Sequence, residues 1–191
     1  MDTRETLVAA ALKVLEQDGE AQFSTRAVCA IANVTAPTLY HHFGSADGLL
    51  SAAMTEAFGQ FLASKKAAVQ SSDPETALRQ GWDDYVRFAA ARPRLYAAMM
   101  SRILKGGHIP AAESGFALLR DRIAAIAAEG WLAVGAEIAA DLAWASANAA
   151  AQLHVTAAMR GGARPDSTVI DGLRDQALQI IITPRAKVKS R

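Results

Sequence analysis

Residues that start and stop helices recur along the whole chain, and the apolar residues between them repeat with the period of an α-helix. Asp2, Ser24, Thr35 and Asp73 stand where a side chain can cap a helix N-terminus, and Pro184 ends the last apolar stripe. No segment shows a convincing alternation of apolar and polar residues, which would indicate a strand. The sequence therefore predicts an all-α fold of about nine helices.

Two of the expected helices are short and lie close together near the N-terminus. One is capped by Ser24 and ends at Asn33, a residue type that tolerates the left-handed conformation. The next is capped by Thr35, with Pro37 in its first turn, where no backbone N–H is needed. Two helices of this length joined by a tight turn predict a helix-turn-helix, in which the second helix lies in the major groove of DNA. We expect its small core to consist of Val28, Ile31, Val34, Leu39 and Phe43.

Candidate DNA contacts follow from this motif. Ala36, Pro37 and His41 are expected on the side of the second short helix that faces away from the core, where they could reach base edges. Hydroxyl groups and helix N-termini in the same segment could bind phosphate. The predicted DNA-binding set is Ser24, Thr25, Arg26, Thr35, Ala36, Pro37, Thr38, Tyr40 and His41.

The charge of the N-terminal segment does not favour DNA binding. The whole chain has a net charge of +1, but residues 1–50 hold three basic and six acidic side chains, a net charge of −3. A nucleic-acid-binding segment is ordinarily basic. This observation supports an alternative, a helical small-molecule-binding protein whose DNA binding is weak or lost.

Composition and motifs argue against several other classes of protein. The single cysteine, Cys29, excludes an internal disulfide, and no cluster of His and Cys has the spacing of metal ligands. We expect no cofactor and no metal. A small helical enzyme lacks any acid/base pair or nucleophile at useful spacing. No stretch is long and apolar enough for a membrane span or a signal peptide, so a cytoplasmic location without a membrane partner is expected.

The remainder of the chain is expected to bind a small, mostly apolar effector and to form a homodimer. Its middle helices offer aromatic and methionine side chains but few charges, which is typical of an apolar pocket with a few polar anchors. An alanine-rich helix and the last helix, residues 141–160 and 167–182, are expected to form the dimer interface, with Ala147 and Ile170 within it. The predicted effector-binding residues are Trp82, Tyr85, Tyr96, Met99, Met100 and Asn148.

The N-terminal fifty residues resemble those of the TetR/AcrR repressors. A first helix ending in glycine precedes the helix-turn-helix, and the segment from Thr35 to Ser45 reads TAPTLYHHFGS before a long helix. Three positions depart from the family pattern. Asn33 replaces the turn glycine, Cys29 replaces an alanine, and Ala46 replaces a lysine that contacts phosphate in relatives. The residues that follow the pattern are Thr25, Val28, Ala32, Val34, Thr35, Thr38, Leu39, Tyr40, His42, Phe43, Ser45 and Leu49.

The resemblance implies a repressor that reads a palindromic operator as a dimer, although an activator is left open. It implies that the last two helices of each subunit form a four-helix interface and that the middle helices enclose the effector. It also implies that the effector moves the fourth helix and so releases DNA. The expected organisation is a helix-turn-helix domain at 1–47, an effector-binding and dimerisation domain at 48–184, and a basic, disordered tail at 185–191.

Overall fold

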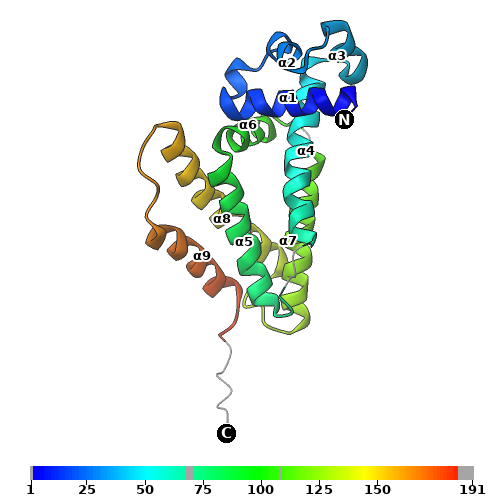
Figure 1. Ribbon diagram of the computed structural model, residues 1–191. Coiled ribbons are helices and arrows are strands. Elements are labelled where there is room, and N and C mark those ends of the chain that lie inside the picture. The colour runs from blue at the N-terminus through cyan, green and yellow to red at the C-terminus, as the bar shows by residue number, and fades with distance from the viewer. Residues whose placement is uncertain (1, 68–70, 108, 185–191) are drawn as a thin grey trace. The chain divides into compact units, whose positions relative to one another are not determined.

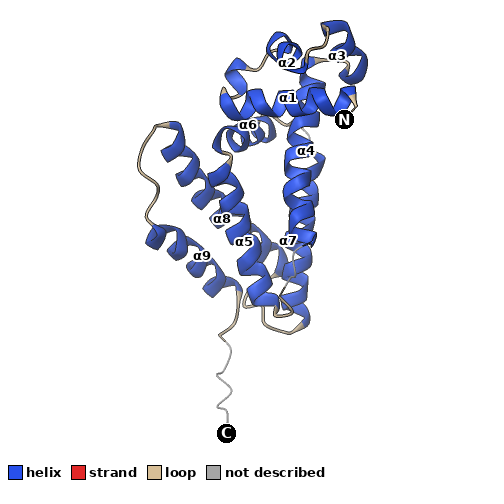
Figure 2. Cartoon of the chain, viewed as in Figure 1, coloured by secondary structure: helices blue, strands red, loops and turns tan. Residues whose placement is uncertain are grey.

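The computed structural model describes residues 2–67, 71–107 and 109–184, and in these ranges the chain is helical (Figures 1 and 2). The predicted tail, 185–191, lies outside the described residues. Nine α-helices occur in the described part, which confirms the predicted fold class, and a 3₁₀ helix at Glu20–Gln22 was not predicted. The α-helices are α1 (Thr3–Gln17), α2 (Thr25–Ala32), α3 (Ala36–Phe43), α4 (Ala46–Ala67), α5 (Pro74–Ala91), α6 (Pro93–Leu104), α7 (Pro110–Ala128), α8 (Ala136–Met159) and α9 (Ser167–Ile181).

At α1, α2 and α5, the side chain that the sequence singles out caps the helix N-terminus. Asp2 and Glu5 form a reciprocal capping box at α1, because each carboxylate accepts the other residue's backbone N–H. The side-chain oxygens of Ser24, Asp73 and Asp166 accept backbone N–H groups at the starts of α2, α5 and α9. Each cap satisfies a donor that has no partner within the helix itself, and so it sets the position where the helix begins.

The chain divides into two compact units. The head unit comprises Met1–Ala68 and Ala91–Ser114, and the bundle unit comprises Val69–Ala90 and Gly115–Arg191. In the head unit, α1 packs against α2, α4 and α6, so α6 belongs with the N-terminal helices although it lies more than seventy residues away from α1 in sequence. The functional boundary near residue 47 stays a prediction.

The core of the head unit confirms most, but not all, of the residues expected around the helix-turn-helix. Val28 and Leu39 are fully buried. Val34 and Phe43 are partly buried. Ile31 is wrong as a core residue, because 45 % of its surface is exposed. The helix has only eight residues, and the apolar pattern of about two turns is too short to identify the buried face. Ile31 lies on the exposed face.

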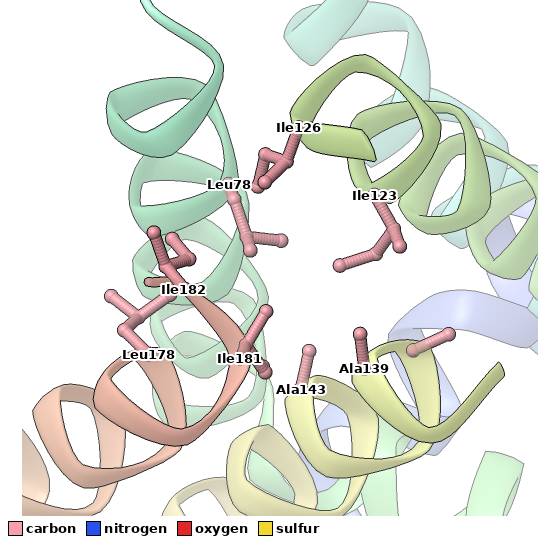
Figure 3. Packing of buried hydrophobic residues seen from close by; sticks show 9 residues of the cluster. Leu78, Ile123, Ile126, Ala139, Ala143, Leu178, Ile181 and Ile182 are labelled. Atoms are coloured by element: carbon pink, nitrogen blue, oxygen red, sulfur yellow. The ribbon is translucent and has the colours of Figure 1, made fainter. Parts of the chain in front are cut away.

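The bundle unit has a core to which four helices contribute. Figure 3 shows side chains from α5, α7, α8 and α9 pointing toward a common centre. Alanines on α8 form its share of this core, and their small side chains let the neighbouring helices approach closely. The labelled members are Leu78, Ile123, Ile126, Ala139, Ala143, Leu178, Ile181 and Ile182.

A second, smaller cluster contains Ala147 and has Ile170 packed against it, the two residues predicted within the dimer interface. Ala147 is buried against Trp82 within its own subunit, where Val86 and Ala150 complete the cluster. Ile170 is partly buried against the same cluster. Ala147 is 6 % exposed and offers little surface to a partner subunit, whereas Ile170 keeps part of its surface exposed, so an interface at α8 and α9 stays a prediction.

Backbone and charged contacts also bring α9 back to earlier helices of the bundle unit. Ala133 donates its N–H to the carbonyl of Ile181 at 2.9 Å, beside an isolated antiparallel bridge between Leu132 and Ile182. Arg174 of α9 forms ion pairs with Asp83 of α5 at 2.9 Å and with Asp171 and Asp175 of α9. Burial opposes the charge on Arg174, but hydrogen bonds to Asp83 and Asp175 outweigh that effect and raise its pKa.

Candidate functional site

The helix-turn-helix is formed by α2 and α3, which are joined at residues 33–35. Asn33 ends α2 with φ 54° and ψ 48°, the left-handed conformation that the turn needs to reverse the chain. Asparagine adopts it at lower cost than most residues, so the exchange for the family's glycine keeps the turn intact. The backbone N–H of Val34 donates to the carbonyl of Cys29 at 3.2 Å and closes the turn. The predicted motif is therefore confirmed as a local structure.

The exposed side of α3 carries the residues predicted to read bases. Ala36, Pro37, Tyr40 and His41 are all exposed, whereas Leu39 is buried on the opposite side. Tyr40 is a large aromatic side chain with 46 % of its surface free. The face that α3 turns away from the core is thus the one expected from the sequence.

Hydroxyl groups at the starts of α2 and α3 are arranged differently from one another. Ser24 caps α2 by accepting the N–H of Ala27 at 3.2 Å. Thr35 occupies the cap position of α3 but forms no cap bond, and its hydroxyl instead lies 2.9 Å from that of Thr38. Each of these hydroxyls keeps hydrogen-bonding capacity for a further partner, because a hydroxyl can both donate and accept.

A basic side chain lies in the first turn of α2, two residues after Ser24. Arg26 is exposed and has no carboxylate partner among the described residues. Thr25, at the same helix end, is partly buried. Free backbone N–H groups and the partial positive charge of a helix N-terminus add to the attraction for phosphate at this position.

The junction between α3 and α4 is held by close backbone packing. Ser45 accepts the N–H of Gly48 at 2.9 Å and starts α4. A Cβ atom on Gly48 would lie 2.2 Å from the carbonyl oxygen of Phe43, so only glycine fits there. Arg4 of α1 stacks over the ring of Phe43 at 5.4 Å from its centroid. The end of the candidate recognition helix is therefore fastened to both α1 and α4.

The acidic charge of the N-terminal helices is balanced by cations from the segment around α6. Because half of the six acids in residues 1–50 are paired in this way, the −3 charge overstates the repulsion toward DNA. Over the two sequence ranges of the head unit, nine basic and eight acidic side chains leave a net charge of +1. The pairs are Arg92–Glu16 at 3.1 Å, Lys105–Glu20 at 3.6 Å and Arg102–Asp47 at 2.9 Å.

The six candidate effector residues fall into two groups. In the bundle unit, the indole N–H of Trp82 donates to Ser146 at 2.9 Å, and the hydroxyl of Tyr85 donates to Asn148 at 3.0 Å. The side-chain amide of Asn148 in turn donates to the carbonyl of Trp144 at 2.8 Å. The structure thus brings three of the predicted residues together between α5 and α8. The other three, Tyr96, Met99 and Met100, lie on α6 in the head unit, where the first two are buried.

The bundle unit also holds a cation that was not predicted from the sequence. Arg122 of α7 lies against the backbone of α5, where a Cβ atom on Gly81 would come within 1.5 Å of its Nη1 atom. Burial lowers the pKa of Arg122, and the nearby Asp84 partly offsets that effect. The available signal was one arginine among the apolar repeats of α7, but nothing in the sequence links it to Gly81.

Two other kinds of feature do not occur among the described residues. No group of three or more His, Cys, Asp or Glu side chains in this part of the chain is arranged so that it could hold a metal ion. None of the described helices has the length and apolarity needed to cross a bilayer.

A helix-turn-helix whose second helix is exposed is typical of DNA-binding regulators. Residues 7–53 match the family described as bacterial regulatory proteins, tetR family. The N-terminal segment of this chain therefore matches the TetR family of transcriptional regulators. This assignment confirms the resemblance seen in the first fifty residues. No curated protein matches the chain.

Solved structures share the fold over almost the whole chain. A putative tetR family transcription regulator from Shewanella sp. PV-4 has a TM-score of 0.72 at 20 % identity, covering 96 % of this chain and 100 % of that one. A protein of unknown function from Rhodococcus sp. RHA1 has a TM-score of 0.76 at 25 % identity, covering 96 % and 97 %. The fatty acid degradation regulator FadR from Bacillus halodurans has a TM-score of 0.72 at 16 % identity, covering 100 % and 98 %.

Proposed function

We propose that this regulator is a repressor that binds a palindromic operator as a homodimer and releases it when a small effector binds. The observation that carries the proposal is the exposed face of α3 within a helix-turn-helix that matches the TetR family. On this proposal Ala36, Pro37 and His41 contact base edges. The side chains of Ser24, Thr25, Arg26, Thr35, Thr38 and Tyr40 contact phosphates and fix the position of the protein on the duplex.

Footprinting on DNA that flanks the gene for this chain tests the proposal. We expect protection of an inverted repeat whose half-site centres lie on one face of the duplex, about one helical turn or a multiple apart. A retarded band without any protected repeat would contradict operator binding. It would favour the alternative of a helical small-molecule-binding protein with weak DNA binding. Pairing of the head acids with the cations around α6 removes one of the two reasons for that alternative and leaves only Ala46.

A homodimer is supported by the apolar surface that α8 and α9 leave uncovered. Six of the large hydrophobic side chains that are exposed in the described chain lie on these two helices. Large exposed apolar side chains that gather on neighbouring elements are typical of interaction sites. A two-fold interface between copies of α8 and α9 would bury these side chains, and palindrome recognition requires such symmetry. The six residues are Ile138, Trp144, Leu153, Met159, Val169 and Ile180.

The proposed effector is a small, mostly apolar molecule bound by residues of 48–184. Its proposed contacts in the bundle unit are Trp82, Tyr85 and Asn148, whereas Tyr96, Met99 and Met100 of the head unit stay separate candidates. It releases DNA only if it binds the DNA-incompetent conformation more tightly than the DNA-bound one. The coupling is reciprocal, so operator DNA weakens effector binding by the same factor. Calorimetry with and without operator measures this factor, and an unchanged effector affinity would rule out the coupled mechanism.

Replacing Ala46 by lysine is expected to tighten binding to operator and to random DNA alike. Ala46 is the first residue of α4 and is partly exposed, at the place where relatives carry a phosphate-binding lysine. One added phosphate contact should steepen the slope of log K against log salt by about 0.9. Fluorescence anisotropy at several salt concentrations measures the slope. The matched control is Ala125→Lys, which adds the same charge on an exposed position of α7 and should leave the slope unchanged.

A further inference from the structure

The head unit contains a cavity of about 420 Å³ that none of the assignments above uses. It lies between α1, α4, α6 and the first residue of α7. Its polar lining consists of two guanidinium groups, from Arg4 and Arg102, two hydroxyls, from Ser51 and Thr55, and the carboxylate of Glu56. Four of these five groups can donate hydrogen bonds, so the cavity offers mainly donors to a ligand.

Both arginines of the cavity also touch the junction that ends the candidate recognition helix. Arg4 stacks over Phe43, the last residue of α3. Arg102 binds both carboxylate oxygens of Asp47, in the first turn of α4, with Nη2 and Oδ2 2.9 Å apart. A ligand that changes either contact acts on the residues that hold α3 against α4.

The two side chains of the ion pair between Arg102 and Asp47 differ in how much of their surface is exposed. The side chain of Arg102 is 17 % exposed, whereas that of Asp47 is 70 % exposed. A largely buried guanidinium needs an anionic partner, since an unpaired buried charge is costly. Asp47 can return to water at little cost because most of its surface is already hydrated. An anion in the cavity can therefore replace Asp47 as the partner of Arg102.

We propose that this cavity binds a small carboxylate or phosphate anion through Arg102 and Arg4, with Ser51 and Thr55 as additional donors. The bound anion displaces Asp47 from Arg102, so α6 loses its contact with the start of α4 and the α3–α4 junction loosens. The carboxylate of Glu56 offsets one of the two arginine charges of the lining, which leaves a net positive charge to attract the anion. The lining shares no residue with the effector-binding set proposed above, and the proposal of an anion site does not require that the protein binds DNA.

Equilibrium dialysis with radiolabelled succinate or inorganic phosphate tests the site on the full chain without DNA. We expect about one anion per chain, with the ionic strength held constant by sodium chloride. Asp47→Asn removes the competing carboxylate and should tighten binding roughly tenfold, whereas Arg102→Gln should abolish it. The two variants thus move affinity in opposite directions, although both break the same ion pair. The tighter of the two probes distinguishes a carboxylate from a phosphate ligand.

Three further variants or measurements separate binding from a structural effect. Arg4→Gln changes an exposed side chain and should weaken anion binding roughly tenfold. This variant still tests the site if Arg102→Gln does not fold. Glu137→Gln breaks the ion pair with Arg120 in the bundle unit and should leave anion binding unchanged. Hydrogen exchange at residues 36–47 should quicken when the anion is bound. The proposal is wrong if neither probe binds wild type and Asp47→Asn, or if Asp47→Asn weakens binding.

Discussion

Replacing Trp144 or Ile180 by glutamate is expected to convert the protein from a dimer to monomers and to abolish operator binding. Trp144 is 46 % exposed on α8 and Ile180 is 51 % exposed on α9. A carboxylate placed in an apolar two-fold interface is buried twice, once in each subunit, without a partner. Loss of one central aromatic or aliphatic anchor should raise the dimer Kd roughly thirtyfold or more. Sedimentation velocity at micromolar concentration measures the change.

The control for this experiment is Leu104→Glu. Leu104 is also a large, exposed hydrophobic residue, but it lies at the end of α6, outside the proposed interface. This variant should therefore remain dimeric. The interface would have to be placed elsewhere if Leu104→Glu dissociated the protein while the α8 and α9 variants did not. A wild-type chain that sediments as a monomer at this concentration would refute the dimer itself.

Replacing His41 by alanine is expected to lower affinity for the operator by roughly tenfold or more while leaving affinity for random DNA nearly unchanged. His41 lies on the exposed face of α3, which is proposed to contact base edges. A lost base contact costs discrimination at one position of each half-site. Competition binding against a set of operators, each with one substituted base pair, shows which position loses its preference.

Arg26→Gln provides the contrast to His41→Ala. Arg26 stands at the start of α2, two residues after Ser24, and it is proposed to contact phosphate. Its loss should weaken binding to all sequences by a similar factor and make the salt slope shallower by about 0.9. If His41→Ala weakened operator and random DNA equally, His41 would not be a base-reading residue.

Features that depend on neighbours in sequence could be predicted from the sequence. Ser24 and Asp166 each cap a helix by accepting a backbone N–H two or three residues further on. Donor and acceptor therefore lie within one turn of the chain. Asn33 marks the left-handed turn for the same reason. The exposed face of α3 followed from the spacing of Pro37 and His41 relative to Leu39.

Features that join distant segments could not be predicted in this way. The ion pair between Glu16 and Arg92 could not be predicted, because the local sequence does not show that two charges 76 positions apart lie close together in the fold. Ala147 was placed in the dimer interface because alanine permits close approach both inside a subunit and between subunits. The close approach of Arg122 to Gly81 depends equally on the packing of α7 against α5. The spacing of apolar residues identifies the apolar face of a helix, but it does not show which helix or subunit packs against that face.

The pairing of the acids of the head with the cations around α6 limits how this protein can be divided and recombined. A chimera that takes residues 1–47 and joins them to another regulator would leave Glu16, Glu20 and Asp47 without their partners. Such a graft would keep the net charge of −3 of residues 1–47 without the compensating cations, even if every residue of α2 and α3 were correct. Transplanting the specificity of this protein therefore requires carrying Arg92, Arg102 and Lys105 along with the reading helix, or redesigning the three carboxylates to neutral residues.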